Sequence, residues 1–266
     1  FVGGNTLMLS ILRDELGKTG KPVRTEGFDA AIEETRRMLR ESTAELEIAE
    51  VRREGEQVAV RVAVANLCGH KLPTAYPSRR VWIRLRIKQG DGQIVFASGQ
   101  FDQRGRIVNA AGQPLASELP GGPVAMHRSN IDASDQVQIY EAVMQDAKGD
   151  ITYSLLRGAQ YGKDNRLLPQ GWTADHERGP VTAAVGLDED TRFVAGSHQV
   201  TYVVEAPAEH GPYEIEATLL FQTMGARYAA ELFLNDVPEM AHFRSLYEAA
   251  DARPEVLAET SQHFAD

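Results

Sequence analysis

The hydrophobic positions near the start of the chain follow the period of an α-helix. In residues 28–42 the positions Phe28, Ile32, Thr35 and Leu39 recur three or four residues apart, and charged residues fill the other faces. This spacing places the apolar side chains on one side of a helix. The sequence therefore predicts two helices before residue 45, over 5–17 and 28–42.

From about residue 45 the hydrophobic period shortens to about two residues, which is typical of a strand with one buried face. Every second residue is valine in 58–64, and Val, Ile, Leu and Ile alternate with Trp and Arg in 81–87. The Gln-Gly-Asp-Gly stretch at 89–92 has the composition of a hairpin turn. Further strands are expected at 137–143, 200–204 and 213–221, and long irregular connections at 105–135 and 158–195.

Short alternating strands without a strand–helix–strand rhythm predict a mainly β protein, with an antiparallel, immunoglobulin-like β-sandwich. Helical spacing returns after Gly225, at Tyr228, Leu232 and Phe233. We therefore expect helices to flank the sandwich at both ends, either as packing elements or as a connection to whatever precedes Phe1. The expected segments are an N-terminal helical segment over 1–44, a β-sandwich domain with long loops over 45–222, and a C-terminal helical segment over 223–266.

Composition excludes several classes of protein. The chain has 266 residues, with 28 Lys and Arg against 38 Asp and Glu, which gives a formal net charge of −10. This acidic balance argues against a nucleic-acid partner, because phosphates attract clustered basic residues. No apolar run approaches the roughly 18 residues of a membrane-spanning helix, so we expect no membrane span. With Cys68 as its single cysteine, the chain forms no intrachain disulfide and has no C-x-x-C-H site for covalent haem.

The start of the chain is unusual. It reads Phe1-Val2-Gly3-Gly4-Asn5, without an initiator methionine and without the basic-then-apolar pattern of a signal peptide. We therefore expect it to be a processed or excised part of a longer protein. Chemistry that these residues lack would then belong to the part that precedes Phe1.

Two histidines are candidate ligands, because imidazole is the commonest protein ligand for haem iron and transition metals. His70 lies in a short loop stiffened by Gly69 and Pro73. His127 closes a long loop, and it would form a mixed nitrogen–oxygen metal site if it met Glu141. The alternatives are a loop histidine bonded to backbone at position 70 and a buried Glu141 bonded to loop backbone.

Two further polar groups lie in or beside the loops. Arg79 and Arg80 are adjacent at the start of a strand and point to opposite faces, which favours one internal ion pair over joint binding of an anion. Asp164, Asn165 and Arg166 form the densest polar cluster of any loop, but the D-x-[DN]-x-[DN]-G calcium pattern is absent. Because Asp and Asn side chains bond to nearby amides, we expect them to fix turns.

Known catalytic motifs are missing from the sequence, which contains no G-x-S-x-G, H-E-x-x-H, G-x-x-x-x-G-K-[ST] or G-x-G-x-x-G. An enzymatic role is therefore disfavoured. A hydrolase or metalloenzyme would need two or more of the seven histidines to converge with a carboxylate. The aromatic residues Tyr76, Tyr161 and Trp172 would instead offer stacking surfaces to a small molecule.

Four stretches carry a family resemblance: FVGGN at 1–5, GHKLPT at 69–74 with PSRR at 77–80, QVQIYE at 136–141, and KDNRLLP at 163–169. Together they resemble the carboxy-terminal portion of exported bacterial multihaem c-type cytochromes. In that family a run of C-x-x-C-H haem sites is followed by a β-rich domain. The resemblance extends from residue 1 to about residue 230, and its strongest motifs are the loops around His70 and around Asp164.

The resemblance implies a periplasmic or cell-surface electron-transfer protein. This chain departs from the family because it has no haem-attachment motif, so haem c would belong to a preceding region or to a partner cytochrome. Our leading hypothesis is a non-haem accessory domain that packs against or docks the haem-bearing part, with His70 and His127 as candidate axial haem ligands. The alternative is a periplasmic module that binds a small molecule or carbohydrate through the loops 105–135 and 158–195, with the candidate residues Tyr76, Arg79, Arg80, Tyr161, Asp164, Asn165, Arg166 and Trp172.

Overall fold

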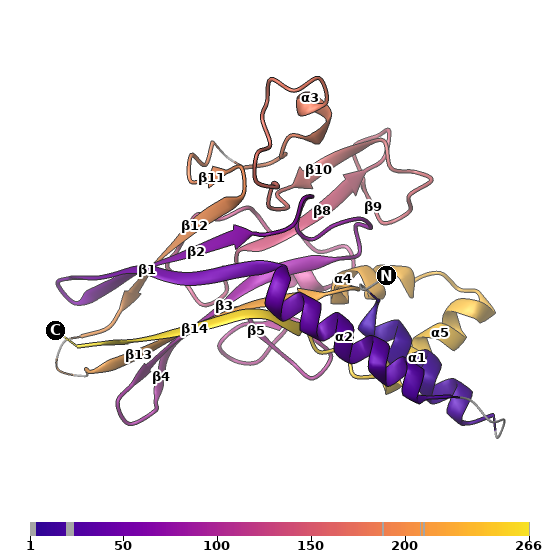
Figure 1. The fold of residues 1–266 in the computed structure, drawn as a ribbon, viewed down its shortest axis with the longest axis horizontal. Coiled ribbons are helices and arrows are strands. Elements are labelled where there is room, and N and C mark those ends of the chain that lie inside the picture. The colour runs from indigo at the N-terminus through magenta and orange to yellow at the C-terminus, as the bar shows by residue number, and fades with distance from the viewer. Residues whose placement is uncertain (1–3, 20–23, 188, 208, 210, 266) are drawn as a thin grey trace.

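Two β-sheets form the body of the molecule, as the computed structural model shows (Figure 1). The structure describes all residues except 1–3, 20–23, 188, 208, 210 and 266, so the first three residues of the FVGGN stretch lie outside it. The first sheet has the order β1-β2-β12-β11, and β7 pairs with β12 in parallel. Its strands are β1 (Ala44–Glu54), β2 (Gln57–Asn66), β12 (Ser197–Glu205), β11 (Phe193–Val194) and β7 (Asn130–Ile131).

The second sheet has the order β10-β8-β3-β13-β14, with β4 paired to β3 and β9 paired to β8. All of its pairs are antiparallel. Its strands are β10 (Gln160–Asp164), β8 (Ile139–Gln145), β3 (Arg80–Gln89), β13 (Tyr213–Gln222), β14 (Glu255–Phe264), β4 (Ile94–Ser98) and β9 (Ile151–Thr152).

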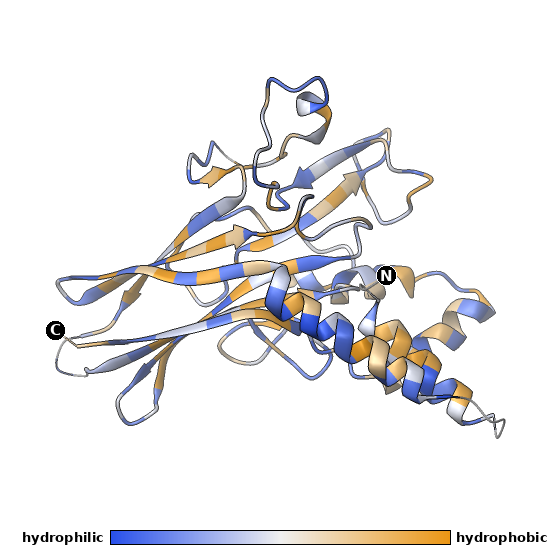
Figure 2. Ribbon diagram, viewed as in Figure 1, coloured by the Kyte–Doolittle hydropathy of each residue, from blue (hydrophilic) through white to orange (hydrophobic). Residues whose placement is uncertain are grey.

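The facing sides of the two sheets share one hydrophobic core. The four valines of β2 at 58–64 and the four aliphatic residues of β3 at 81–87 all belong to it, and each is at most 1% exposed. Figure 2 shows the matching alternation of apolar and polar residues along the long strands. Burial of each such side chain contributes about 1.5–3 kcal/mol, so the core accounts for the stability of the layered body. The prediction of a mainly β protein with antiparallel sheets is confirmed.

Helices lie at both ends of the chain, as expected. The first pair, α1 (Thr6–Gly17) and α2 (Glu26–Ser42), matches the predicted segments within two residues. After β13 the chain forms α4 (Ala226–Leu232) and α5 (Pro238–Ala249). A second, smaller core joins α1 to α4 and α5 through Leu7, Ile11, Ala229 and Tyr247. Among the described residues, no helix is long and apolar enough to cross a membrane.

One predicted segment needs correction. The segment 223–266 was expected to be helical, but its last part forms β14, which pairs along the edge of β13. Leu257 is its one fully buried side chain, and most of the others are partly or fully exposed. An edge strand needs little apolar surface, so this strand is determined by its backbone hydrogen bonds to β13. Its sequence therefore lacks the alternating hydrophobic pattern from which a strand is predicted.

The long connections contain short elements of their own. The stretch 105–135 includes β6 (Ile107–Val108), which pairs with β5 (Gln100–Phe101), and the 3-10 helix η1 (Ala116–Glu118). The stretch 158–195 was expected to be irregular throughout, but it begins with β10, which ends at Asp164, and it also contains α3 (Gly179–Thr182) and β11.

Candidate functional site

Two histidines and an aspartate meet inside the protein. His127 precedes β7, Asp190 precedes β11, and His198 is the second residue of β12. The Nε2 atoms of His127 and His198 lie 3.0 and 2.8 Å from the same oxygen, Oδ2 of Asp190. The two imidazole rings stack at 4.9 Å between centroids, and Phe193 packs against both of them.

Two amide side chains fix the protonation of His127. Gln138 Nε2 and Asn165 Nδ2 approach Nδ1 of His127 at 3.1 and 3.0 Å. Both amides are held in this orientation, because their oxygens accept the backbone N–H groups of Arg128 and Glu141. Since Nδ1 faces two donors, it must accept, and the proton of neutral His127 lies on Nε2 and is donated to Asp190.

His198 is fixed in the same way by a tyrosine. The hydroxyl of Tyr140 lies 2.9 Å from Nδ1 of His198, and burial raises the pKa of Tyr140, so the hydroxyl stays protonated and donates. Burial and the neighbouring His127 lower the pKa of His198 to about 4. At neutral pH His198 is therefore uncharged, and its Nε2–H is donated to Asp190.

Asp190 holds the negative charge of the cluster. Burial alone would raise its pKa, but the backbone N–H of Arg192 and the two imidazoles outweigh burial and lower it. The three side chains are nearly inaccessible: the exposed fractions are 1% for His127, 5% for Asp190 and 0% for His198. Every ring nitrogen and both carboxylate oxygens thus have partners within the protein.

The convergence that a metalloenzyme would require is present, since the three ligand atoms lie within 4.8 Å of one another. Two histidines and a carboxylate suit a transition metal. A metal on Nε2 of His127 would, however, require the ring proton to move to Nδ1, which faces two N–H donors. The hydrogen bonds therefore fit a structural network better than they fit a metal site. Glu141, which would have formed a metal site with His127 only if the two met, instead has its Oε1 atom 3.1 Å from Lys163 Nζ.

A second polar cluster joins the two loops that carry the strongest sequence motifs. Asp164, which is 1% exposed, binds Lys71 Nζ through Oδ2 at 2.6 Å and Arg166 Nε through Oδ1 at 2.7 Å. Burial would raise the pKa of Asp164, but these two cations outweigh it and lower the pKa. Leu72 and Leu167 add two backbone hydrogen bonds of 2.9 Å between the loops. Asp164 therefore fixes long-range loop packing as well as a local turn.

His70 lies on the outside of this junction and is exposed. Its Nδ1 is 3.1 Å from the carbonyl oxygen of Lys71, and its own carbonyl accepts from Asn66 Nδ2 at 2.9 Å. The Nδ1–H is donated to the Lys71 carbonyl, which leaves Nε2 as the nitrogen able to accept or to bind a metal. A hydrogen bond from one ring N–H to a backbone carbonyl is the arrangement that orients ligating histidines.

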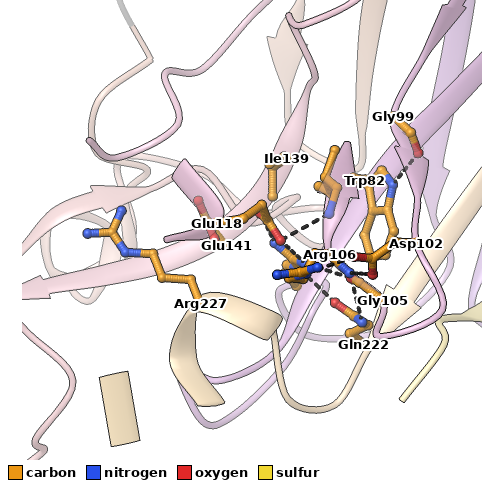
Figure 3. Close-up of polar contacts among 12 residues, drawn as sticks. Trp82, Gly99, Asp102, Gly105, Arg106, Glu118, Ile139, Glu141, Gln222 and Arg227 are labelled. Carbon is orange, nitrogen blue, oxygen red and sulfur yellow. Dashed lines mark hydrogen bonds and ion pairs between the residues drawn. The ribbon is translucent and has the colours of Figure 1, made fainter. Parts of the chain in front are cut away.

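The adjacent arginines separate, as their positions on the strand predict. Arg80 is buried and binds Glu118 through two hydrogen bonds of 2.5 and 2.8 Å. Gln222 Oε1 and the carbonyl of Gly105 also accept from Arg80, and Figure 3 shows Glu118, Gln222 and Gly105 close together. Arg79 is half-buried and donates to the carbonyl of Thr74 at 3.4 Å. The predicted internal ion pair is confirmed for Arg80.

The three candidate aromatic residues do not share the same surroundings. Tyr161 is exposed beneath the guanidinium of Arg166, at 5.7 Å. Trp172 donates its Nε1–H to Thr182 Oγ1 at 3.0 Å and packs partly against the main core. Tyr76 lines a separate open cavity of about 720 Å³ that neither of the other two rings reaches.

The cavity beside Tyr76 is bordered by exposed apolar side chains. Tyr228 lies between Tyr76 and Tyr153, with edge-to-face contacts at 5.8 and 5.7 Å, and its hydroxyl donates to that of Tyr76 at 3.1 Å. Leu156 is fully exposed, and Leu234 is 65% exposed. We call this surface the Tyr76 patch, and it consists of Tyr76, Ile151, Tyr153, Leu155, Leu156, Tyr228 and Leu234.

Comparisons with known proteins give one structural match. No protein-family model matches the chain, and no curated protein matches it. Among solved structures, the crystal structure of a penta-heme cytochrome c552 from Thermochromatium tepidum is similar, with 13% sequence identity and a TM-score of 0.47. The match covers 86% of this chain and 41% of that cytochrome, so the chain spans about two fifths of its length.

Proposed function

We propose that this chain is a haem-free accessory domain of an exported multihaem c-type cytochrome system. It docks the haem-bearing part, which is either joined to it or a partner cytochrome. The sequence resemblance at the His70 and Asp164 loops supports this class of protein. With a single cysteine, the chain has no covalent haem of its own.

The observation that carries the proposal is the exposed Tyr76 patch. Contiguous apolar surfaces that include aromatic residues are typical of interaction sites, and Tyr is enriched at interface cores. In the β9–β10 connection Leu155 is 51% exposed and Leu156 is fully exposed. Asn5 Oδ1 accepts from Thr223 Oγ1 at 2.9 Å, so the start of the chain lies beside the residues that lead into α4, the helix that supplies Tyr228 to the patch.

We further propose His70 as an axial ligand to a haem carried by the docked part. A haem supplies reversible one-electron transfer, and a histidine ligand helps to set its potential. His70 fits this role because it is exposed and its Nδ1–H is held by the Lys71 carbonyl. His127 fits it poorly, since both ring nitrogens are bonded inside the protein.

The docking proposal is tested by capture of a haem protein. The immobilised chain should retain a polypeptide that stains for covalent haem from a periplasmic extract of the source organism. Leu156→Asp should abolish retention, because a charge in the patch would have to be desolvated. Val181→Asp is the matched control: Val181 is 76% exposed on α3, away from the patch, and its variant should bind as the wild type does. Equal retention by Leu156→Asp would contradict docking through the patch.

Ligation by His70 is tested on the same complex. Its Soret spectrum should change in His70→Ala and remain unchanged in His242→Ala, which alters an exposed histidine on α5. An unchanged spectrum in His70→Ala with normal retention would remove the ligand role and leave docking intact.

The small-molecule alternative stays a weaker proposal. It requires the loops 105–135 and 158–195 to present aromatic rings to one ligand. The cavity lined by Tyr76 contains neither Tyr161 nor Trp172, so these rings do not form a common stacking site there.

A further inference from the structure

A second cavity, which shares only Leu234 with the Tyr76 patch, lies between α4, α5 and the turn that joins β5 to β6. It has a volume of about 530 Å³, within the range of about 300–1,000 Å³ usual for small-molecule sites. Its inner wall is apolar and includes Ala226, Ala229 and Ala230 of α4 together with Phe233. Because three positions facing it are alanine, the helix leaves room for an apolar group.

The rim of this cavity is positively charged, in contrast to the acidic chain. Arg104, Arg106 and Arg244 line it together with one carboxylate, that of Glu248. Asp102 binds Arg106 at 2.7 Å and Glu248 binds Arg244 at 2.8 Å, so two of the three cations are compensated. The guanidinium of Arg104 makes no hydrogen bond or ion pair with any residue that the structure describes, and one positive charge remains for a ligand.

The turn that carries Arg104 is held rigidly. Asp102 Oδ1 accepts the backbone N–H groups of Arg104 and Arg106 at 2.9 and 3.0 Å. The carbonyl of Gly105 accepts from the buried side chains of Arg80 and Gln222, and Figure 3 shows Gly105 beside Gln222. Arg104 is therefore presented by a turn anchored to the protein interior.

A buried donor completes the arrangement. Tyr247 lies in the cavity wall, is 8% exposed, and its hydroxyl has no hydrogen-bond partner among the described residues. Burial raises the pKa of Tyr247, so the hydroxyl remains a donor at neutral pH. An unmade hydrogen bond of this kind costs about 1–3 kcal/mol, which a ligand acceptor would recover once the cavity wall opens enough to expose the buried hydroxyl.

We propose that this cavity binds a small monocarboxylate with an apolar body, such as an arylalkanoate. The carboxylate would bind Arg104 and accept from Tyr247, and the apolar body would fill the space beside the alanines of α4. The site does not depend on the accessory role proposed above.

The test is calorimetric titration of the full chain with 4-phenylbutyrate and with its neutral isostere 4-phenylbutanamide. The acid should bind at one site and more tightly than the amide. Arg104→Gln should weaken the acid by about tenfold and bring the two ligands to similar affinity, because one charged hydrogen bond is lost. Arg24→Gln, which changes another exposed arginine, should bind as the wild type does.

Two further variants separate binding from folding. Ala230→Leu should block both ligands by filling the cavity, and Tyr247→Phe should weaken the acid several-fold without lowering the melting temperature, because its hydroxyl has no partner to lose. Equal affinity for acid and amide, wild-type binding by Arg104→Gln, or no saturable binding of the acid at millimolar concentration would each overturn the proposal.

Discussion

Two tyrosine hydroxyls in the main core have opposite surroundings, although both side chains are 0% exposed. Tyr140 donates to His198, whereas Tyr202 has no hydrogen-bond partner among the described residues. We expect Tyr140→Phe to lower the free energy of unfolding by about 1–3 kcal/mol, because it leaves Nδ1 of His198 buried and unpaired. Tyr202→Phe should be neutral or stabilising. Urea denaturation of the two variants decides this, and equal effects would contradict the proposed network.

The network around Asp190 should make stability depend on pH. His198 has a pKa of about 4 in the folded protein and an ordinary value of 6.5, so the unfolded chain binds the proton first as the pH falls. Stability is complete above about pH 6.5 and is lost as the pH falls towards 4. Between about pH 7.5 and pH 5 the loss should be about 2 kcal/mol. The lowered pKa of Asp190 adds a further loss only at still lower pH.

Urea denaturation of His198→Gln at about pH 7.5 and about pH 5 checks the direction of this pH dependence. The variant should be less stable at neutral pH, and its stability should change less between the two values than that of the wild type. His242→Gln, which replaces an exposed histidine, should keep the wild-type dependence. A wild-type protein that is equally stable at both values would show that His198 titrates normally.

The residues of this network differ in how far the sequence predicts them. His127 and Asn165 stood out by type and position in their loops. His198 lies two residues before Val200 on the same strand. The two-residue period of the strand therefore places it on the buried face with Val200, Tyr202 and Val204, where an imidazole needs partners. Asp190 has no such signal, because it lies in an irregular stretch and only the folded chain brings it to the histidines.

At the scale of elements, the turn between β5 and β6 depends on one glycine. Gly105 has φ of +72°, and an added Cβ would overlap the Gln222 side chain and the Ala252 carbonyl. Gly105→Ala should therefore lower the free energy of unfolding by about 3 kcal/mol, from backbone strain and overpacking together. Gly112, with φ of +75° and open space around it, is the control, and its alanine variant should lose about 1 kcal/mol. Similar losses in urea denaturation would show that the turn does not pack as described.

Strand prediction succeeded where one face is buried and failed where little is buried. The runs in β2 and β3 alternate strictly because their inner faces form the core. In β14 only Leu257 is fully buried, so the pattern gives no period and the preceding helices dominate the expectation. Pairing with β13, a strand more than thirty residues earlier in the chain, determines this edge strand.

At the scale of the whole molecule, the sequence singled out Tyr76 but not its neighbours. Tyr153 and Tyr228 come from a loop beside β9 and from α4, and they meet Tyr76 because β8 pairs with β3 and Gly225 bonds to Ser78. Such long-range pairing has no local signature. The resulting patch is the feature on which the proposed docking role rests.

Hydrogen–deuterium exchange of the chain with and without the captured haem-bearing part tests docking most directly. Amides of residues 151–157, which lie in the Tyr76 patch, should exchange more slowly in the complex, while those of α3 should be unaffected. Unchanged exchange at 151–157, or protection confined to α3, would contradict the account.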